Sequence, residues 1–159
     1  MDDDSGYCID VDGEPEPSAE RAELLRAAVR AALRRFDVPR AVVSVALVDD
    51  AHIAELNAQF LKHDGATDVI TFDLRDEGEA GALKVDGEIV ISADTAAREA
   101  RSRGHDVEKE LALYAVHGVL HLLGHDDAEE AEAAAMHRIE DEILASLGMG
   151  RVYHSEMTG

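Results

Sequence analysis

Apolar residues recur along the first half of the chain with two different spacings. Over residues 18–36 they return every three or four positions, which predicts an amphipathic helix capped by Ser18. Residues 41–48 form a nearly unbroken run rich in valine, which predicts a strand buried on both faces. Shorter patterns of the same two kinds predict two further elements: a strand at residues 7–11 and a short helix capped by Asp49 or Asp50.

The second half of the chain begins with an alternating segment. Residues 68–74 place Val69, Thr71 and Asp73 on one side of a predicted strand, and this polar side could line a cleft. A polar loop at residues 75–86 and a strand at residues 87–91 are expected next. Three helices complete the prediction: one capped by Ser92 or Asp94 that ends near Gly104, one over residues 106–123 and one over residues 128–147. The middle helix is apolar on most faces, which is typical of a helix at the centre of a domain.

The composition predicts one domain. The chain has 159 residues, of which 46% are hydrophobic, so that residues 1–159 can form a single unit with a substantial core. The single cysteine, Cys8, excludes an internal disulfide. Because neither a signal peptide nor an apolar run of about 18 residues is present, we expect a cytoplasmic protein without a membrane span.

The predicted central helix contains two histidines one turn apart. His117 and His121 lie at positions i and i+4, which an α-helix brings onto one face with Cβ atoms roughly 5–6 Å apart. Two imidazoles at this spacing can bind one cation. The alternative is a pair of core histidines hydrogen-bonded to neighbouring groups, which would have to satisfy every buried ring nitrogen. We therefore interpret the pair as metal ligands.

The residues after this pair provide candidates for a third ligand. Gly124 can adopt the left-handed conformation that ends a helix and turns the chain back. We predict that Asp127 then completes the site, with His125 as its rival. Asp127 could instead cap the last helix, because Asp127 and Glu130 have the spacing of a capping box. Three protein ligands would leave one coordination position for water, as in catalytic metal sites.

The pattern H-x-x-x-H-x-x-G-x-x-D has the ligand spacing of metzincin proteases. Those enzymes use the glutamate of H-E-x-x-H as a general base, and Gly118 occupies that position here. The spacing thus favours a catalytic metal ion, whereas the missing glutamate argues against a peptidase.

The same segment resembles the signature of the YbeY-type endoribonucleases and rRNA maturation factors, H-G-x-L-H-L-x-G-[YH]-D-H. Ten of the eleven positions at residues 117–127 fit this signature. The resemblance covers most of residues 40–153 and includes four more segments: residues 55–57, 66–72, 87–92 and 136–147.

The resemblance implies an α+β fold in which a small mixed sheet of about four strands is flanked by about five helices. It also implies one divalent metal ion on the central helix, with zinc as the favoured ion and His117 and His121 as ligands. The implied activity is cleavage of single-stranded RNA in 16S rRNA maturation and ribosome quality control. The expected partners are single-stranded RNA, rRNA and the small ribosomal subunit or its associated factors, and neither DNA nor a membrane is expected.

Three positions depart from the family pattern. Asp127 stands where the family has its third histidine; a carboxylate oxygen binds zinc at about 2.0–2.2 Å but also favours harder metals such as manganese. A family arginine suited to hold phosphate aligns with Leu61, and the adjacent Lys62 either replaces it as a point charge or is a solvated loop lysine. Thr71 replaces a family serine and keeps a hydroxyl group on the side of its strand that faces the cleft.

The reaction expected at this site is hydrolysis of a phosphodiester by a water molecule that the ion activates. Asp126 is the candidate base, although it could instead cap the last helix. The ion could alternatively activate the 2′-hydroxyl of the RNA, and the sequence leaves both routes open.

The formal net charge of −20 opposes RNA binding. We therefore expect arginines to gather near the cleft, or the ribosome to supply the targeting; the candidates are Arg75, Arg98, Arg101 and Arg103. Two other functions stay open: a metallohydrolase of another substrate, including peptides, and a ribosome-assembly factor that keeps its metal ion for stability.

Overall fold

In the computed structural model of this protein, the described residues are 6–13, 16–58, 69–74, 84–124 and 130–148. They form four strands and five helices. The strands are β1 (Tyr7–Gly13), β2 (Arg40–Val48), β3 (Val69–Asp73) and β4 (Lys84–Ser92), and the helices are α1 (Ala19–Arg35), α2 (Asp50–Leu56), α3 (Ala93–Arg103), α4 (Val107–Leu122) and α5 (Glu130–Ser146). None of these helices is both long enough and apolar enough to cross a bilayer.

The four strands form one mixed sheet in the order β1-β2-β4-β3. Strand β2 pairs in parallel with β1 and with β4, whereas β3 runs antiparallel to β4 at the edge. The α+β class and the mixed four-stranded sheet predicted from the sequence are therefore confirmed. The single domain spanning residues 1–159 stays a prediction.

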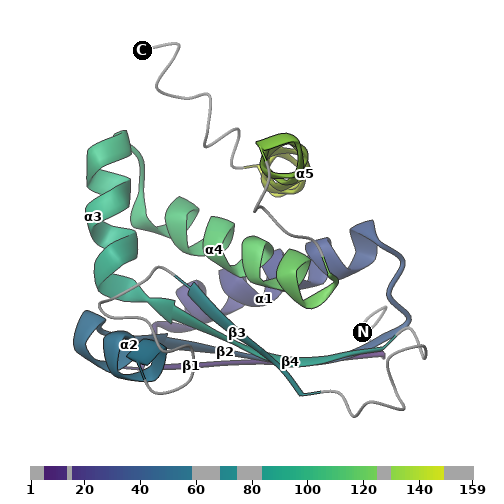
Figure 1. The fold of residues 1–159 in the computed structure, drawn as a ribbon, viewed down its shortest axis with the longest axis horizontal. Coiled ribbons are helices and arrows are strands. Elements are labelled where there is room, and N and C mark those ends of the chain that lie inside the picture. Colours follow the sequence, from purple (N-terminus) through teal and green to yellow (C-terminus); the bar gives the residue numbers. More distant parts are fainter. Residues whose placement is uncertain (1–5, 14–15, 59–68, 75–83, 125–129, 149–159) are drawn as a thin grey trace.

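The two faces of the sheet are covered differently. Alternate residues of the strands, such as Val45 on β2 and Ile89 on β4, belong to the main core beneath α1 and α4. The intervening residues, such as Val90 on β4, pack in a smaller cluster with Ile53 of α2. Figure 1 shows α1 and α4 lying along one face of the sheet, with α5 seen nearly end-on beyond α4. The short helix α2 thus covers only part of the opposite face.

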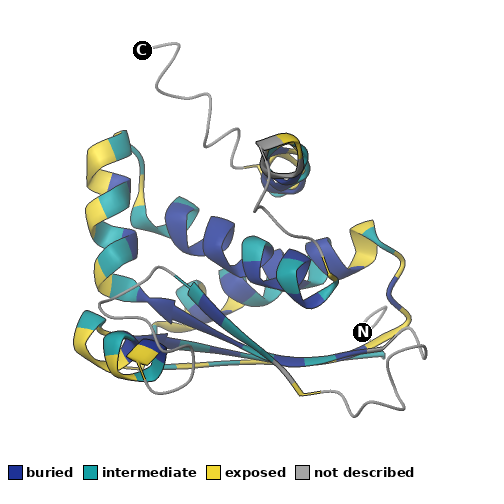
Figure 2. Ribbon diagram, in the orientation of Figure 1, coloured by how far each residue is buried: buried dark blue, intermediate teal, exposed yellow. Residues whose placement is uncertain are grey.

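Helix α4 is the centre of the fold. It contacts α1, α3, α5, β3 and β4, and most of its length is buried (Figure 2). The buried, apolar character predicted for this helix is confirmed. Because helices or strands pack on several of its faces, side chains from distant segments can meet along it.

Two helix caps predicted from the sequence, Ser18 and Ser92, are confirmed, whereas a third candidate, Asp94, is not a cap. Ser18 accepts a hydrogen bond from the Arg21 amide, and Ser92 accepts one from the Thr95 amide. Of the two candidates for the cap of α3, Asp94 was the wrong one, because its carboxylate accepts a hydrogen bond from the amide of Asp50 in α2. The side chain of Asp94 therefore ties two helices together instead of beginning one.

Strand β4 begins earlier than the sequence pattern predicts. The segment that we expected to be loop up to Asp86 enters the sheet at Lys84, in parallel register with Arg40 of β2. A neighbouring strand supplies hydrogen bonds that a single-sequence pattern does not contain, and it overrides the loop-like composition of the segment.

Candidate metal centre

The histidine pair lies near the C-terminal end of α4, where the i, i+4 spacing brings the two rings together. The Nε2 atoms of His117 and His121 are 2.9 Å apart, and the ring centroids are 4.5 Å apart at an interplanar angle of 78°. Both rings are partly buried. Two ring nitrogens therefore converge on a single point beside the helix.

A buried glutamate on α5 contacts the ring of His117 at Nδ1, the nitrogen that does not face His121. Glu140 is fully buried, and its Oε2 lies 2.5 Å from Nδ1 of His117. This contact joins α5 to α4 across 23 residues of sequence. It involves Nδ1, whereas Nε2 is the ring nitrogen that faces His121.

Two glycines allow α4 to lie close to the sheet at the level of the histidines. A Cβ atom on Gly118 would lie 2.7 Å from Cγ2 of Ile89, and one on Gly87 would lie 2.7 Å from Cδ2 of Leu122. Real Cβ atoms do not approach other carbon atoms so closely, so a larger residue at either position would displace its neighbour. These glycines fix the distance between the histidine pair and strands β3 and β4.

Strand β3 brings the hydroxyl of Thr71 to the same side of the sheet. Thr71 is the antiparallel partner of Ile89, and partner residues in a sheet project to the same face. Because Ile89 packs beneath Gly118, Thr71 projects toward α4 and is partly buried there. The facing of Thr71 toward a cleft stays a prediction.

The chain turns after α4 as the glycine predicts. Gly124 has φ +99°, in the left-handed region, and its amide donates to the His121 carbonyl. The segment that follows, with His125, Asp126 and Asp127, lies outside the described residues. Lys62 lies outside them as well. The roles assigned to Asp126, Asp127 and Lys62 therefore stay predictions.

The donor set of the described residues fits part of a metal site. Two Zn–N bonds of about 2.0–2.1 Å in a tetrahedral site place the nitrogens roughly 3.3 Å apart, close to the spacing of the two Nε2 atoms. A carboxylate behind a ligating imidazole is the usual arrangement around such ligands. Within the described ranges, however, no group of three His, Cys, Asp or Glu side chains could hold a metal ion. A third ligand would have to come from elsewhere, as was predicted for Asp127.

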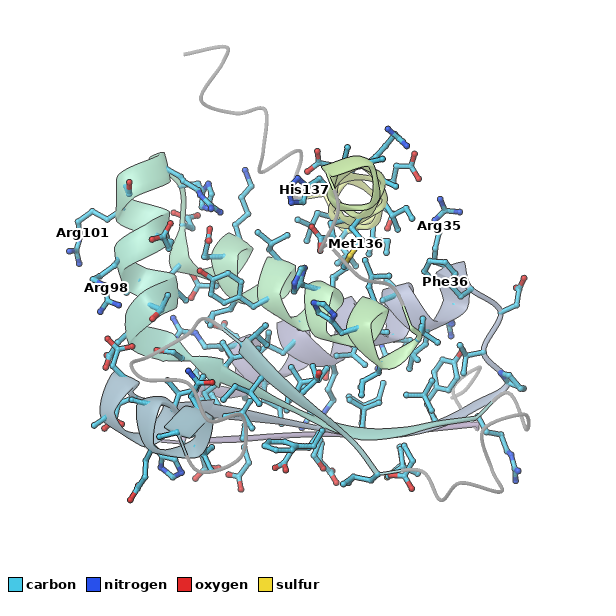
Figure 3. All side chains as sticks on the ribbon, viewed as in Figure 1. Arg35, Phe36, Arg98, Arg101, Met136 and His137 are labelled. Atoms are coloured by element: carbon cyan, nitrogen blue, oxygen red, sulfur yellow. The ribbon has the colours of Figure 1, made fainter. Side chains whose placement is uncertain are left out.

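Two of the arginines expected at a cleft bind carboxylates of neighbouring helices. Arg98 binds Asp50 of α2 at 2.6 Å, and Arg103 binds Glu110 at the start of α4 at 2.8 Å. Figure 3 shows Arg98 and Arg101 projecting outward from α3, away from the core. Arg75 lies outside the described residues. A role of the α3 arginines in RNA binding stays a prediction, although carboxylates of neighbouring helices already bind Arg98 and Arg103.

Glu140 is the residue of this site that the sequence reasoning missed. It belongs to the stripe of α5 that faces the core, between Met136 and Ile143, which are both buried. Figure 3 shows Met136 pointing from α5 toward α4. An acidic residue at helical spacing between Met136 and Ile143, which are apolar, was the signal that could have identified it, because a fully buried carboxylate needs a specific partner.

Comparisons with known proteins agree on one family. The family model described as "Endoribonuclease YbeY" matches residues 11–148. The endoribonuclease YbeY of Carboxydothermus hydrogenoformans is 46% identical over 110 residues, which are 69% of this chain and 75% of that protein. The endoribonuclease YbeY of Geobacillus thermodenitrificans is 38% identical over 149 residues, which are 89% of this chain and 96% of that protein.

A solved structure supports the same assignment. The solution structure of TM1509 from Thermotoga maritima superposes with a TM-score of 0.57 at 27% identity and covers 89% of this chain and 91% of its own. The family-model match spans both the histidine pair and Glu140. This chain belongs to the YbeY endoribonuclease family.

Proposed function

We propose that this protein is a metal-dependent endoribonuclease that cleaves single-stranded RNA in the cytoplasm, in the maturation and quality control of 16S rRNA. The observation that carries this proposal is the convergence of two Nε2 atoms, 2.9 Å apart, on one helix of a protein from an endoribonuclease family. The small ribosomal subunit or its associated factors would direct an acidic protein of net charge −20 to its RNA.

The residues proposed to hold the ion are His117, His121 and Asp127, with zinc as the favoured metal. Such an ion, when bound, supplies a Lewis acid that polarises a phosphoryl oxygen and lowers the pKa of a water molecule. Around it, Lys62 would attract the phosphate charge and the Thr71 hydroxyl would donate to a phosphate oxygen. Asp126 would accept the proton of the attacking group, whether that group is water or the 2′-hydroxyl.

The structure gives a further reason to disfavour the peptidase alternative. In an H-E-x-x-H enzyme, the glutamate after the first histidine acts as the base. Gly118, at that position here, faces Ile89 of β4 so closely that even a Cβ atom would lie 2.7 Å from it. A glutamate side chain would collide with the sheet, so this packing is incompatible with that base.

The test is cleavage of a labelled single-stranded RNA that spans an end of precursor 16S rRNA, with the same RNA in a duplex as the substrate control. His117→Ala removes one ligand, and His52→Ala is the matched control because His52 is exposed on α2. We expect the protein and His52→Ala to cleave the single strand. His117→Ala should lose at least about 100-fold in rate, and a chelator should abolish cleavage until zinc is restored.

Cleavage that survives both His117→Ala and the chelator would contradict the proposal. Absence of cleavage together with intact binding to small ribosomal subunits would favour the assembly-factor alternative. Hydrolysis of a peptide but not of RNA would favour the metallohydrolase alternative.

A further inference from the structure

We propose that Glu140 is a positioning residue, which holds His117 in the one tautomer whose Nε2 lone pair points to the metal ion and which supplies the negative charge that favours a cation there. This inference rests on the proposed metal site. It assigns to α5, a helix outside the signature at residues 117–127, a direct part in metal affinity.

The first argument concerns the proton between the two side chains. The 2.5 Å contact between Nδ1 of His117 and Oε2 of Glu140 is the geometry of an imidazole N–H that donates to a carboxylate oxygen, which places the ring proton on Nδ1. A neutral imidazole that carries its proton on Nδ1 has its lone pair on Nε2. That nitrogen is the one that lies 2.9 Å from Nε2 of His121. The contact with Glu140 thus prepares His117 as a ligand before any ion arrives.

The second argument concerns charge. Glu140 is fully buried, and its Oε1 has no hydrogen-bond partner among the described residues. Within the same part of the chain, no arginine or lysine forms an ion pair with it. A buried carboxylate without a positive partner is strongly destabilising. A cation bound at Nε2 of His117, one imidazole ring away, would compensate this charge.

A second buried glutamate on the same protein provides a matched control. Glu110 is also fully buried, and its Oε1 lies 2.6 Å from Nε2 of His105. Its other oxygen accepts from Arg103 at 2.8 Å, so that its charge is already balanced within the fold. Glu140→Gln and Glu110→Gln therefore make the same chemical change at two buried Glu–His contacts, of which one adjoins the proposed metal site.

The experiment measures zinc affinity by competition with a chromophoric chelator, for the unsubstituted protein and for both variants. Glutamine can replace the acceptor but not the charge, and its amide N–H can also donate to Nδ1 and so select the wrong tautomer. We expect Glu140→Gln to bind zinc about 10–100-fold more weakly and Glu110→Gln to bind it as the unsubstituted protein does.

A second measurement needs no substitution of the glutamate. The side-chain 15N spectrum of the metal-free protein at about pH 8, where free imidazole is neutral, reports the tautomer of each histidine. The signals of His117 are identified by their loss in His117→Ala. We expect His117 to carry its proton on Nδ1, and we expect Glu140→Gln to show a mixture of the two tautomers.

The outcomes separate this inference from the proposed function. Zinc affinity that is equal in Glu140→Gln and the unsubstituted protein would overturn the inference and leave the function standing, as would a tautomer of His117 protonated on Nε2. If the unsubstituted protein binds no zinc, the proposed metal site fails, and this inference fails with it. If Glu140→Gln does not fold, as judged by circular dichroism, the tautomer in the unsubstituted protein decides.

Discussion

Helix α4 meets a fully buried glutamate near each of its ends, and each glutamate contacts a histidine. At the start of the helix, Glu110 contacts His105 and Arg103, which all lie within eight residues of sequence. Near the other end, Glu140 comes from α5 and contacts His117, whose ring faces a second histidine. Glu110 forms an ion pair with an arginine, whereas among the described residues no arginine or lysine pairs with Glu140. The same contact thus belongs to a charge-balanced group at the start of α4 and, near its other end, to the proposed metal site.

Removal of Glu110 should produce the largest loss of stability. Glu110→Ala leaves Arg103 and the nearly buried His105 without their acceptor, and we expect the free energy of unfolding to fall by about 3 kcal/mol. The exposed part of Arg103 keeps the value at the low end of the range for broken buried pairs. Urea denaturation with zinc and with a chelator should give the same loss. A loss confined to the zinc-bound protein would contradict the inference that Glu110 stabilises the fold independently of the proposed metal site.

Removal of the proposed metal ion should lower stability only through the histidine pair near the C-terminal end of α4. With free zinc at about 100 times its Kd, bound zinc contributes about 2.7 kcal/mol to the free energy of unfolding, and a chelator removes this contribution. The same shift is expected for His52→Ala, whereas His117→Ala should show little shift. Thermal unfolding of the three proteins with and without chelator measures the effect. Equal shifts in His52→Ala and His117→Ala would place the ion elsewhere.

The close contact between α4 and the sheet can be tested at Gly118. Gly118→Ala forces a Cβ atom against Ile89, and overpacking of this kind costs about 1–3 kcal/mol. Ile89→Ala in the same chain makes room, so the double variant should lose less stability than the sum of the two single variants. Strict additivity would show that the helix shifts freely. A shift of α4 should also weaken zinc binding at His117 but leave the Glu110 contacts intact.

The partly buried carboxylate of Asp50 should give the smallest effect, and it provides the reference for the two fully buried glutamates. The Ser92 hydroxyl, followed by Arg98 and Thr95, donates to Asp50 and lowers its pKa below the ordinary value of 3.8. A lowered pKa stabilises the fold fully above that value, and this contribution is lost as the pH falls through the lowered pKa.

We expect Asp50→Asn to cost about 1 kcal/mol at neutral pH. The difference from the unsubstituted protein should shrink toward zero in strong acid. Chemical denaturation at several pH values measures it, with Asp10→Asn on the exposed side of β1 as the control. A difference that did not change with pH would mean that the charge of Asp50 is irrelevant to stability.

The sequence predicted what depends on neighbours along the chain. The helices with long apolar periodicity, the caps at Ser18 and Ser92 and the pairing of His117 with His121 all depend on contacts within four residues. The left-handed Gly124 belongs to the same class. Each of these features follows from helix geometry, which is the same in every protein.

The sequence did not predict what depends on segments far apart. Asp94 accepts from Asp50, 44 residues away, and Lys84 enters the sheet only because β2 lies beside it. Glu140 contacts His117 across 23 residues, and α3 arginines bind carboxylates of α2 and α4. A polar side chain with several possible partners binds one of them only after the helices and strands have packed together.

Because α5 follows α4 in the chain, the acceptor for His117 is synthesised 23 residues after the histidine itself. During translation, the nascent protein can form the sheet and the Glu110 group while His117 still lacks Glu140. If the proposed metal site holds an ion, tight binding would therefore wait until α5 has been synthesised and has docked against α4. An incomplete nuclease would in this way hold its ion only weakly while still attached to the ribosome that made it.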